Sequence, residues 1–359
     1  MEKTNAAHEM KNGNGTYAHD MIALGASAGG VEALLTVIRT LPYDLPATLF
    51  IVLHIPADAP SMMPELLNRV GNLHALHPSD DQQIERGHIY VAPPDHHLLV
   101  EKGYVRVVKG PKENRHRPAI DPLFRSLALA YGPRAVGVVL TGSLDDGTAG
   151  LLAIKRRNGT VIVQDPQDAL YSSMPQSALE HVDVDYVVPL AEVGPLLIRL
   201  STEIPHSTTV GPVPEDMEIE VKMAEADMRN QYDDKQVGKP SPYSCPECGG
   251  VLWEIQDDQL VRFRCRVGHA FSLDSMMAEQ AEALEEAIWT ALKIVQERGS
   301  ISHRMAQQAR TNGHIALAQR YDDRKRDADQ RATLLMNALK MLDPIPVPVE
   351  ESEKKESPI

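Results

Sequence analysis

The sequence predicts an α/β fold built on a doubly wound, mostly parallel sheet, with a small zinc-ribbon-like module and a helical C-terminal tail. Hydrophobic residues make up 43% of the chain but aromatic residues only 4%, so the core must consist mainly of aliphatic side chains. Such a core is typical of a parallel sheet covered by helices. Short apolar runs alternate with segments of helical periodicity in the first half of the chain, which is the order of βαβ units.

The alternation places each element of the expected sheet. Apolar runs predict strands over 21–25, 48–53, 135–140 and 160–164, and a hairpin of 98–101 with 104–108 across Lys102-Gly103. Helical periodicity predicts helices over 31–41, 121–131 and 148–157. The second of these helices is expected to start with Asp121 at its N-cap and Pro122 in its first turn.

Charge and hydropathy argue against two function classes. The formal net charge of −14 disfavours a general nucleic-acid-binding protein, because phosphate contacts need clustered Lys and Arg. No apolar run approaches the ~20 residues that cross a bilayer, and the polar N-terminus lacks a signal-peptide pattern. We therefore expect a cytoplasmic protein without membrane insertion.

Three residues with catalytic side chains stand just after predicted strands. Ser27 and His54 follow the first and second strands, and Asp146 lies in the loop after the strand over 135–140. The carboxyl ends of parallel strands meet at one edge of the sheet, where ligands bind. A serine hydroxyl needs an adjacent imidazole to accept its proton, and a carboxylate must orient that imidazole. The sequence therefore predicts a Ser-His-Asp hydrolase site.

The segment GASAGG fits this hypothesis because its glycines allow a sharp turn into the following helix. The N-terminus of that helix directs N–H groups and a positive dipole end toward charge that develops at the serine. The amides of Ala28 and Gly29 are therefore candidates for binding an oxyanion.

Each residue also has a simpler interpretation. GASAGG can be only a tight connection, His54 a buried structural histidine, and Asp146 a turn-capping residue beside Gly147. A dinucleotide loop is disfavoured, because Ser27 replaces the second glycine of G-x-G-x-x-G and His54 stands where a ribose-binding carboxylate belongs. The order Ser…His…Asp and the missing G-x-S-x-G elbow indicate a lineage separate from the usual α/β-hydrolases.

Several segments resemble the chemotaxis protein-glutamate methylesterase family. They are LGASAGGVEAL around Ser27, VLHIP around His54, APPDHHLLV, RPAID over 117–121, VVLTGSLDDGTAGL around Asp146, and QDPQDALYSSMPQSAL over 164–179. The similarity covers residues 21 to 200, and the ordered set is far more specific than any one motif.

The resemblance implies hydrolysis of glutamate methyl esters on the cytoplasmic helices of methylated chemoreceptors, with deamidation of receptor glutamines as a second activity. It assigns Ser27 as nucleophile, His54 as base and Asp146 as orienting carboxylate, and no cofactor is needed for that chemistry. The family commonly carries a phosphorylatable receiver domain before the esterase domain, whereas this chain has a short polar leader. We therefore expect activity that is constitutive, or governed by a separate protein or by the C-terminal module.

One loop departs from the family pattern. The usual G-M-G-x-D-G reads Gly142-Ser143-Leu144-Asp145-Asp146-Gly147 here. If the backbone N–H of Ser143 binds the oxyanion, serine can replace the family's methionine at this position. Gly142, the residue before it, is a candidate for shaping this loop. Leu144 in place of glycine is expected to alter the loop, the rate or the substrate. Asp145 is an alternative to Asp146 for the carboxylate role.

The three cysteines form a metal-ligand pattern together with one histidine. The pairs are Cys245-x2-Cys248 and Cys265-x3-His269, separated by sixteen residues. Four soft or borderline ligands in two close pairs are the ligand set of a closed, structural zinc site. The expected hairpin of 251–255 with 260–264 fits a zinc ribbon, which is too small to fold without its metal. Unrelated reduced cysteines are the alternative.

We predict the following segments: a disordered leader over 1–19, a serine hydrolase domain over 20–200, a linker over 201–240, a zinc-ribbon-like module over 241–272, a helical tail over 273–342, and a disordered end over 343–359. Two or three helices are expected in the tail. One apolar stripe contains Ala278, Ala281, Leu284, Ile288, Leu292 and Val295, and a second surface contains Ile315, Leu317, Leu334, Leu335 and Leu339.

These stripes favour packing within a helical bundle, although such a tail could also bind chemosensory signalling proteins through helix-in-groove contacts. Three function classes therefore remain: a methylesterase, which the motifs favour, a catalytically weak adaptor of a chemosensory assembly, and a nucleotide-dependent oxidoreductase. An adaptor would keep its function when Ser27 is replaced by Ala, and an oxidoreductase would bind NADH.

Overall fold

The computed structural model of the protein describes residues 18–205, 213–225 and 237–342. Most of the predicted leader, all of the predicted disordered end and parts of the predicted linker lie outside these residues. Contacts divide the chain into two compact units, Met1–Met276 and Met277–Ile359. The domain boundaries predicted from the sequence stay predictions.

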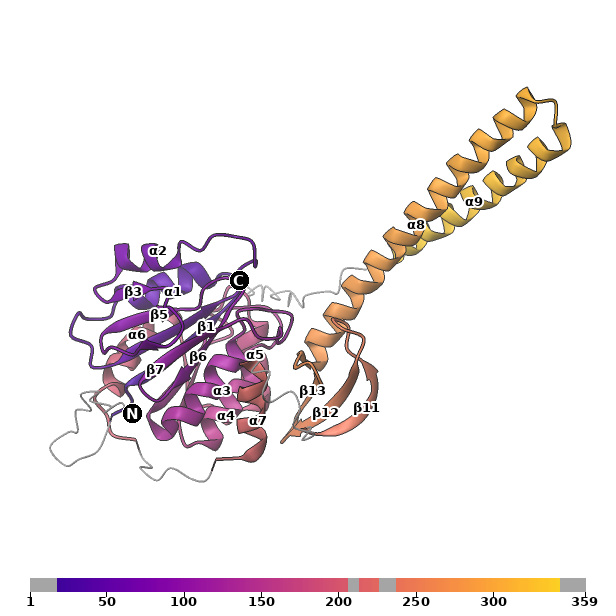
Figure 1. Ribbon diagram of the computed structural model, residues 1–359. Helices are drawn as coiled ribbons and strands as arrows, with labels where there is room; N and C mark the ends of the chain where they lie inside the picture. The colour runs from indigo at the N-terminus through magenta and orange to yellow at the C-terminus, as the bar shows by residue number, and fades with distance from the viewer. Residues whose placement is uncertain (1–17, 206–212, 226–236, 343–359) are drawn as a thin grey trace, which may run out of the picture. The chain divides into compact units, whose positions relative to one another are not determined.

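A seven-stranded sheet lies at the centre of the first unit, with the strand order β10-β9-β8-β1-β2-β5-β3 (Figure 1). All of its neighbouring strands run parallel, which confirms the expected parallel α/β fold. The long central strands are buried along their whole length, as their uninterrupted apolar runs require. The strands are β1 (Met21–Ala26), β2 (Thr48–Leu53), β3 (His74–Leu76), β5 (His88–Val91), β8 (Ala135–Val139), β9 (Thr160–Gln164) and β10 (Tyr186–Val188).

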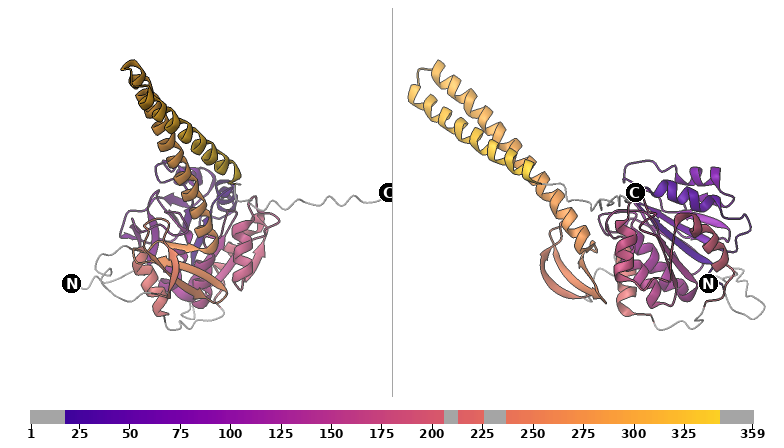
Figure 2. Two further views of the ribbon diagram at one scale, coloured as in Figure 1. Left: turned by 90° about the vertical axis from the view of Figure 1, so that its right-hand side faces the viewer. Right: turned by 180° about the vertical axis from the view of Figure 1, so that it is seen from behind.

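Helices cover both faces of this sheet (Figure 2). On one face Leu34, Ile38 and Leu67 pack into an aliphatic cluster with the strands, and on the other face Phe124 and Leu151 do the same. The first face carries α1 (Gly30–Arg39), α2 (Met63–Val70) and α6 (Leu190–Leu200), and the second carries α3 (Ile120–Tyr131), α4 (Thr148–Arg156) and α5 (Ser173–His181). A 3₁₀ turn, Gly132–Arg134, links α3 to β8.

The predicted hairpin forms as β6 (His97–Glu101) and β7 (Tyr104–Val108), which pair antiparallel. Together with the short β4 (Gln82–Gln83) they make a separate three-stranded sheet. Ser126 on α3 donates its hydroxyl to the carbonyl of Leu123, and it accepts the backbone N–H of Val100 on β6. The small sheet therefore lies against α3.

The predicted N-cap role of Asp121 is wrong. Helix α3 begins at Ile120, with Ala119 at the cap position and no side-chain cap. The carboxylate of Asp121 instead accepts the N–H groups of Gly147, at 3.0 Å, and Gly150, at 2.7 Å. It thus satisfies free amides at the start of the neighbouring helix α4, because its side chain leaves α3 on the side that faces that helix.

Helix α7 (Glu215–Ala224) lies within the predicted linker, and it packs against α3 in the first unit (Figure 1). A four-stranded antiparallel sheet follows, which we call the ribbon (residues 239–272). Its strands are β11 (Lys239–Ser244), β12 (Val251–Asp257), β13 (Leu260–Cys265) and β14 (Ala270–Ser272). The predicted hairpin is present as β12 and β13, closed by the pair Asp257 and Leu260.

Two long helices, α8 (Leu273–Thr311) and α9 (Ile315–Met341), follow the ribbon, and α8 enters the second unit at Met277. A Cβ built on Gly299 of α8 would lie 3.4 Å from the Cβ of Ala328 on α9, so small residues bring the two helices together. Of the predicted stripe, Leu292 is buried whereas Leu284 is 50% exposed. Within the described residues, no helix is both long and apolar enough to cross a membrane.

Candidate active site and metal centre

The order of the strands brings the three predicted catalytic residues to one edge of the central sheet. Strand β1 lies between β2 and β8 and runs parallel to both. Ser27 follows β1 directly, His54 follows β2 directly, and Asp146 stands just before α4 in the loop that follows β8. The three residues are far apart in the sequence, but they lie close together because their strands are neighbours in the sheet.

The side chains of these residues form a chain of hydrogen bonds. His54 Nδ1 lies 3.1 Å from Ser27 Oγ, and His54 Nε2 lies 2.8 Å from Asp146 Oδ2. The histidine and aspartate side chains are only 4% and 2% exposed. With Nε2–H donated to the carboxylate, Nδ1 is left to accept the proton of the serine hydroxyl, as a general base must.

Asp146 is held from several sides. Its carboxylate accepts the N–H of Ile120 at 2.7 Å and of Asp121 at 3.3 Å, and the side-chain amide of Asn114 at 3.0 Å. Burial alone would raise the pKa of Asp146. The hydrogen bond and charge of His54, with the donors of Ile120 and Asn114, outweigh burial and hold the pKa below its ordinary value. The carboxylate is therefore kept ionised beside the imidazole.

Asp145, the alternative candidate, is directed to another partner. Its carboxylate accepts the hydroxyl of Ser272 at 2.8 Å. Burial raises the pKa of Asp145 to about 7, against the lowering effect of that hydrogen bond. The carboxylate that contacts His54 thus belongs to Asp146. The preceding Leu144 adopts a positive φ of 62°, which is the conformation that a glycine would adopt without strain.

The loop that carries Gly142 approaches the serine closely. A Cβ built on Gly142 would lie 2.9 Å from the Cβ of Ser27 and 2.1 Å from Met174 Sδ, so only glycine fits there. The N–H of Gly142 donates to the carbonyl of Tyr171, and the N–H of Ser27 donates to that of Thr141. These two amides are therefore engaged in the hydrogen bonds of the loop, and Gly142 stays a loop candidate.

The other three oxyanion candidates keep free amides. Among the hydrogen bonds of the described residues, none uses the N–H of Ala28, Gly29 or Ser143. Gly29 has a positive φ of 73° and stands at the N-cap of α1, so its neighbours lie where the helix dipole favours negative charge. Ala28, Gly29 and Ser143 stay candidates for holding an oxyanion.

Two residues at the site were not predicted from the sequence. The imidazole of His116 stacks on that of His54, with ring centroids 3.6 Å apart and an interplanar angle of 13°. Burial and the neighbouring His54 lower the pKa of His116 to about 3, so its ring is neutral. Asn114 contacts Asp146. The sequence around them, ENRHRP, has no periodic pattern, and only the adjacent RPAID motif pointed to this segment.

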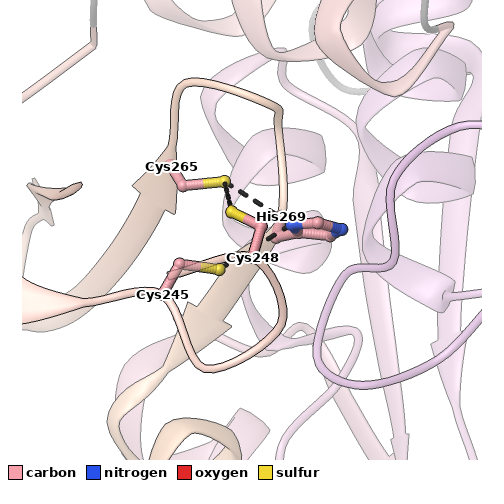
Figure 3. Close-up of side chains that lie close together, drawn as sticks. All are labelled: Cys245, Cys248, Cys265 and His269. Carbon is pink, nitrogen blue, oxygen red and sulfur yellow. Dashed lines mark hydrogen bonds between the residues drawn. The ribbon is translucent and has the colours of Figure 1, made fainter. Parts of the chain in front are cut away.

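The predicted metal ligands come together in the ribbon. The ligand atoms of Cys245, Cys248, Cys265 and His269 all lie within 4.8 Å of one another (Figure 3). The separation between sulfur atoms is 3.7 Å for Cys248 and Cys265, and His269 Nδ1 lies 3.6 Å from Cys265 Sγ. The edges of a tetrahedral zinc site with these donors measure about 3.8 Å between sulfurs and about 3.6 Å between sulfur and nitrogen. The donor set and its spacing therefore fit structural zinc.

Comparison with known proteins identifies related sequences. Residues 22–197 match the CheB methylesterase family. A relative from Leptospira interrogans is 38% identical over 183 residues, which cover 51% of this chain and 95% of the relative. A protein from Hydrogenovibrio crunogenus named "Protein-glutamate methylesterase/protein-glutamine glutaminase" is 39% identical over 187 residues, and the match spans about half of its length.

A solved structure also matches. The catalytic domain of CheB methylesterase from Thermotoga maritima is 31% identical, and the match covers 98% of that chain and 50% of this one with a TM-score of 0.49. The Leptospira relative exceeds 30% identity, and nearly its whole length aligns with this chain. The chain belongs to the CheB methylesterase family.

Proposed function

We propose that this protein hydrolyses glutamate methyl esters in proteins, with Ser27 as nucleophile, His54 as general base and Asp146 as the orienting carboxylate. The observation that carries the proposal is the continuous hydrogen-bonded chain from Ser27 Oγ through the imidazole to Asp146. Membership of the CheB methylesterase family supports the same chemistry. The buried carboxylate and the free amides beside the serine supply the remaining parts of an acyl-transfer site.

The reaction follows from the positions of the donors and acceptors. Ser27 Oγ attacks the ester carbonyl carbon while His54 Nδ1 takes the hydroxyl proton. The oxyanion that forms is held by the amides of Ala28, Gly29 or Ser143. His54 returns the proton to the departing methoxide, which leaves as methanol. Water then attacks the acyl-serine with His54 again as base, His54 returns the proton to Ser27 Oγ, and the substrate protein leaves with a free glutamate side-chain carboxylate. No cofactor takes part in these steps.

A glutamine side chain presents the same carbonyl group with an amide in place of the ester, so the site can also release ammonia. The relative from Hydrogenovibrio crunogenus carries both activities in its name. We propose methylated chemoreceptor cytoplasmic helices as the substrate and the cytoplasm as the location. The helical pair formed by α8 and α9 is proposed to bind chemosensory signalling proteins.

Cys245, Cys248, Cys265 and His269 are proposed to hold a structural zinc ion in the ribbon. The tetrahedral spacing of their donor atoms supports this assignment. The four protein ligands fill a tetrahedral shell, so the ion would stabilise the ribbon rather than bind substrate. When bound, the metal supplies folding free energy to a sheet with a very small apolar core.

Release of methanol from methylated receptor tests the catalytic proposal. Ser27→Ala is expected to lower kcat by about 10⁴-fold or more with folding intact, because the nucleophile is removed. Ser300→Ala, an exposed serine on α8, is the matched control and should behave as wild type. Equal methanol release by wild type and Ser27→Ala would overturn the mechanism, whereas no release by the wild type would favour the adaptor. Parallel measurement of ammonia release tests deamidation separately.

A further inference from the structure

The segment Glu113–His116 contacts two of the three catalytic side chains. Asn114 donates its side-chain N–H groups to Asp146 Oδ1 at 3.0 Å and to Asp121 Oδ2 at 2.8 Å. His116 stacks on His54 two residues later. Asn114 is 5% exposed, and it is an uncharged residue placed between two buried carboxylates. The position of this segment therefore bears directly on Asp146 and His54.

The opposite side of the same segment is held by the ribbon and the start of α8. The N–H of Asn114 donates to the carbonyl of Ala270 at 2.8 Å. The amide oxygen of Asn114 accepts the N–H of Ser272 and the hydroxyl of Ser275, each at 3.2 Å. Ala270 of β14 also forms an isolated parallel β-bridge with Glu113. All of these residues belong to the first compact unit.

These contacts fix which end of the Asn114 amide faces the carboxylates. The donors of Ser272 and Ser275 occupy the amide oxygen, so the amide nitrogen must point toward Asp146 and Asp121. If those donors were lost, the amide could rotate and place its oxygen against a carboxylate, which is repulsive. The hydrogen bonds from Ser272 and Ser275 therefore make Asn114 a donor to Asp146.

The backbone of the segment needs such support. Asn114 and Arg115 adopt positive φ angles of 47° and 73°, a left-handed conformation that strains most residues other than glycine and that asparagine tolerates best. Two consecutive left-handed residues persist only where surrounding contacts hold them. The bonds to Ala270 and Ser272 are among those contacts.

A buried ion network joins the same segment to the metal turn. Glu113 pairs with Arg125 at 2.8 Å and with Arg264 at 3.0 Å, and these side chains are at most 3% exposed. Arg264 directly precedes the ligand Cys265, and it also donates to the carbonyl of Gly268 at 2.9 Å. The turn from Cys265 to His269 is therefore connected to Glu113 by side chains and to Asn114 through β14.

We propose that Asn114 is a positioning residue for the catalytic carboxylate, and that the metal-loaded ribbon holds it in place. This inference rests on the proposed esterase function and gives the ribbon a role in it. Cys265 and His269, with a metal held between them, would fix the turn that joins them, and this turn would hold β14 and so orient Asn114 against Asp146. Loss of the metal would release Asn114 without removing any group that touches substrate.

Kinetics of Asn114→Leu test the positioning role. The variant is expected to lower kcat by about 100-fold with KM nearly unchanged, because a misplaced catalytic group costs rate rather than substrate binding. Ser275→Ala, which removes one donor to the Asn114 oxygen, should give a smaller loss of the same kind. Asn312→Leu, an exposed asparagine of the second unit, is the matched control. Wild-type kcat in a folded Asn114→Leu enzyme would overturn the proposal.

Metal removal tests the coupling to the ribbon. Chelation of the wild type should lower kcat to the level of Asn114→Leu, and chelation of Asn114→Leu should lower it little further. Equal fold losses on chelation in both proteins would overturn the coupling. Hydrogen exchange gives a readout without substrate: the Asn114 amide should lose protection when the metal is removed, and unchanged protection would also overturn the coupling.

The controls separate this inference from the proposed function. Failure of Ser27→Ala to lose activity contradicts the esterase mechanism, whatever Asn114 does. An inactive Ser27→Ala together with a fully active Asn114→Leu contradicts only the positioning role of Asn114.

Discussion

The α/β layers and the ribbon bury their residues in different ways, although both belong to the first compact unit. The layers rest on two large clusters of aliphatic side chains on either face of the sheet. The core cluster of the ribbon contains five of its own residues together with Met276 of α8, and two of the five are the cysteines Cys245 and Cys265. A sheet with so small an apolar core needs metal or charge interactions to fold.

Charged and neutral polar residues fill the surface between the two regions, which we call the seam (Glu113, Asn114, Glu220, Arg264 and Ser272). Glu220 of α7 pairs with Arg264 at 2.8 Å and with Arg262 at 2.9 Å, and all three residues are buried. A polar seam costs desolvation that an apolar one does not, so its stability depends on every partner being present. We therefore expect that loss of partners in the seam releases the ribbon while the layers stay folded.

The largest expected effect comes from removing the metal. Structural zinc contributes about 10 kcal/mol to the folding of small domains, so chelation or Cys265→Ser should unfold the ribbon. The aliphatic core should keep the α/β layers folded. Differential scanning calorimetry is expected to show loss of one transition and retention of the other. If calorimetry shows a single transition that disappears completely, the α/β layers do not stay folded without the ribbon.

Substitution of the two adjacent aspartates separates catalysis from packing at the seam. Asp146→Asn should lower kcat by about 10⁴-fold, because an amide in place of the carboxylate favours the wrong tautomer of His54. Asp145→Asn keeps an acceptor for Ser272 and should retain most of the activity. Methanol release measures both. Comparable losses in the two variants would contradict the assignment.

Glu113→Gln tests the charges of the seam. Removing one partner of a buried ion network costs about 3–5 kcal/mol, because the arginines keep their charge without full compensation. Urea unfolding should show this loss. Asp327→Asn, which breaks the exposed pair with Arg331 on α9, is the control and should cost at most about 1 kcal/mol. Equal effects would show that the seam behaves as a solvated surface.

The raised pKa of Asp145 predicts a pH dependence of stability. Its pKa of about 7 exceeds the ordinary value, so the folded state binds a proton more tightly than the unfolded state does. The stabilisation is present below the ordinary pKa and is lost as the pH rises through about 7. Unfolding free energies of wild type should therefore fall relative to Asp145→Asn between pH 5 and pH 8. Parallel pH curves for the two proteins would contradict this.

The sequence by itself determined most of the fold and the main features of the site. Uninterrupted apolar runs predicted β1, β2 and β8, because fully buried strands need apolar residues on both faces. Ser27 and His54 could be identified since each directly follows such a strand, and parallel strands end at a common edge. The two close pairs of metal ligands were readable because a metal site is encoded in local spacing.

Only the tertiary structure decided which neighbouring residue meets which partner. Asp145 and Asp146 are adjacent and chemically identical, and the path of the loop turns one toward Ser272 and the other toward His54. The contacts of Asn114 with Asp146 and with Ser272 join distant parts of the chain, so no local pattern marks them. Arginines and glutamates are usually solvated, and their burial in the seam follows from the packing of the ribbon against the layers.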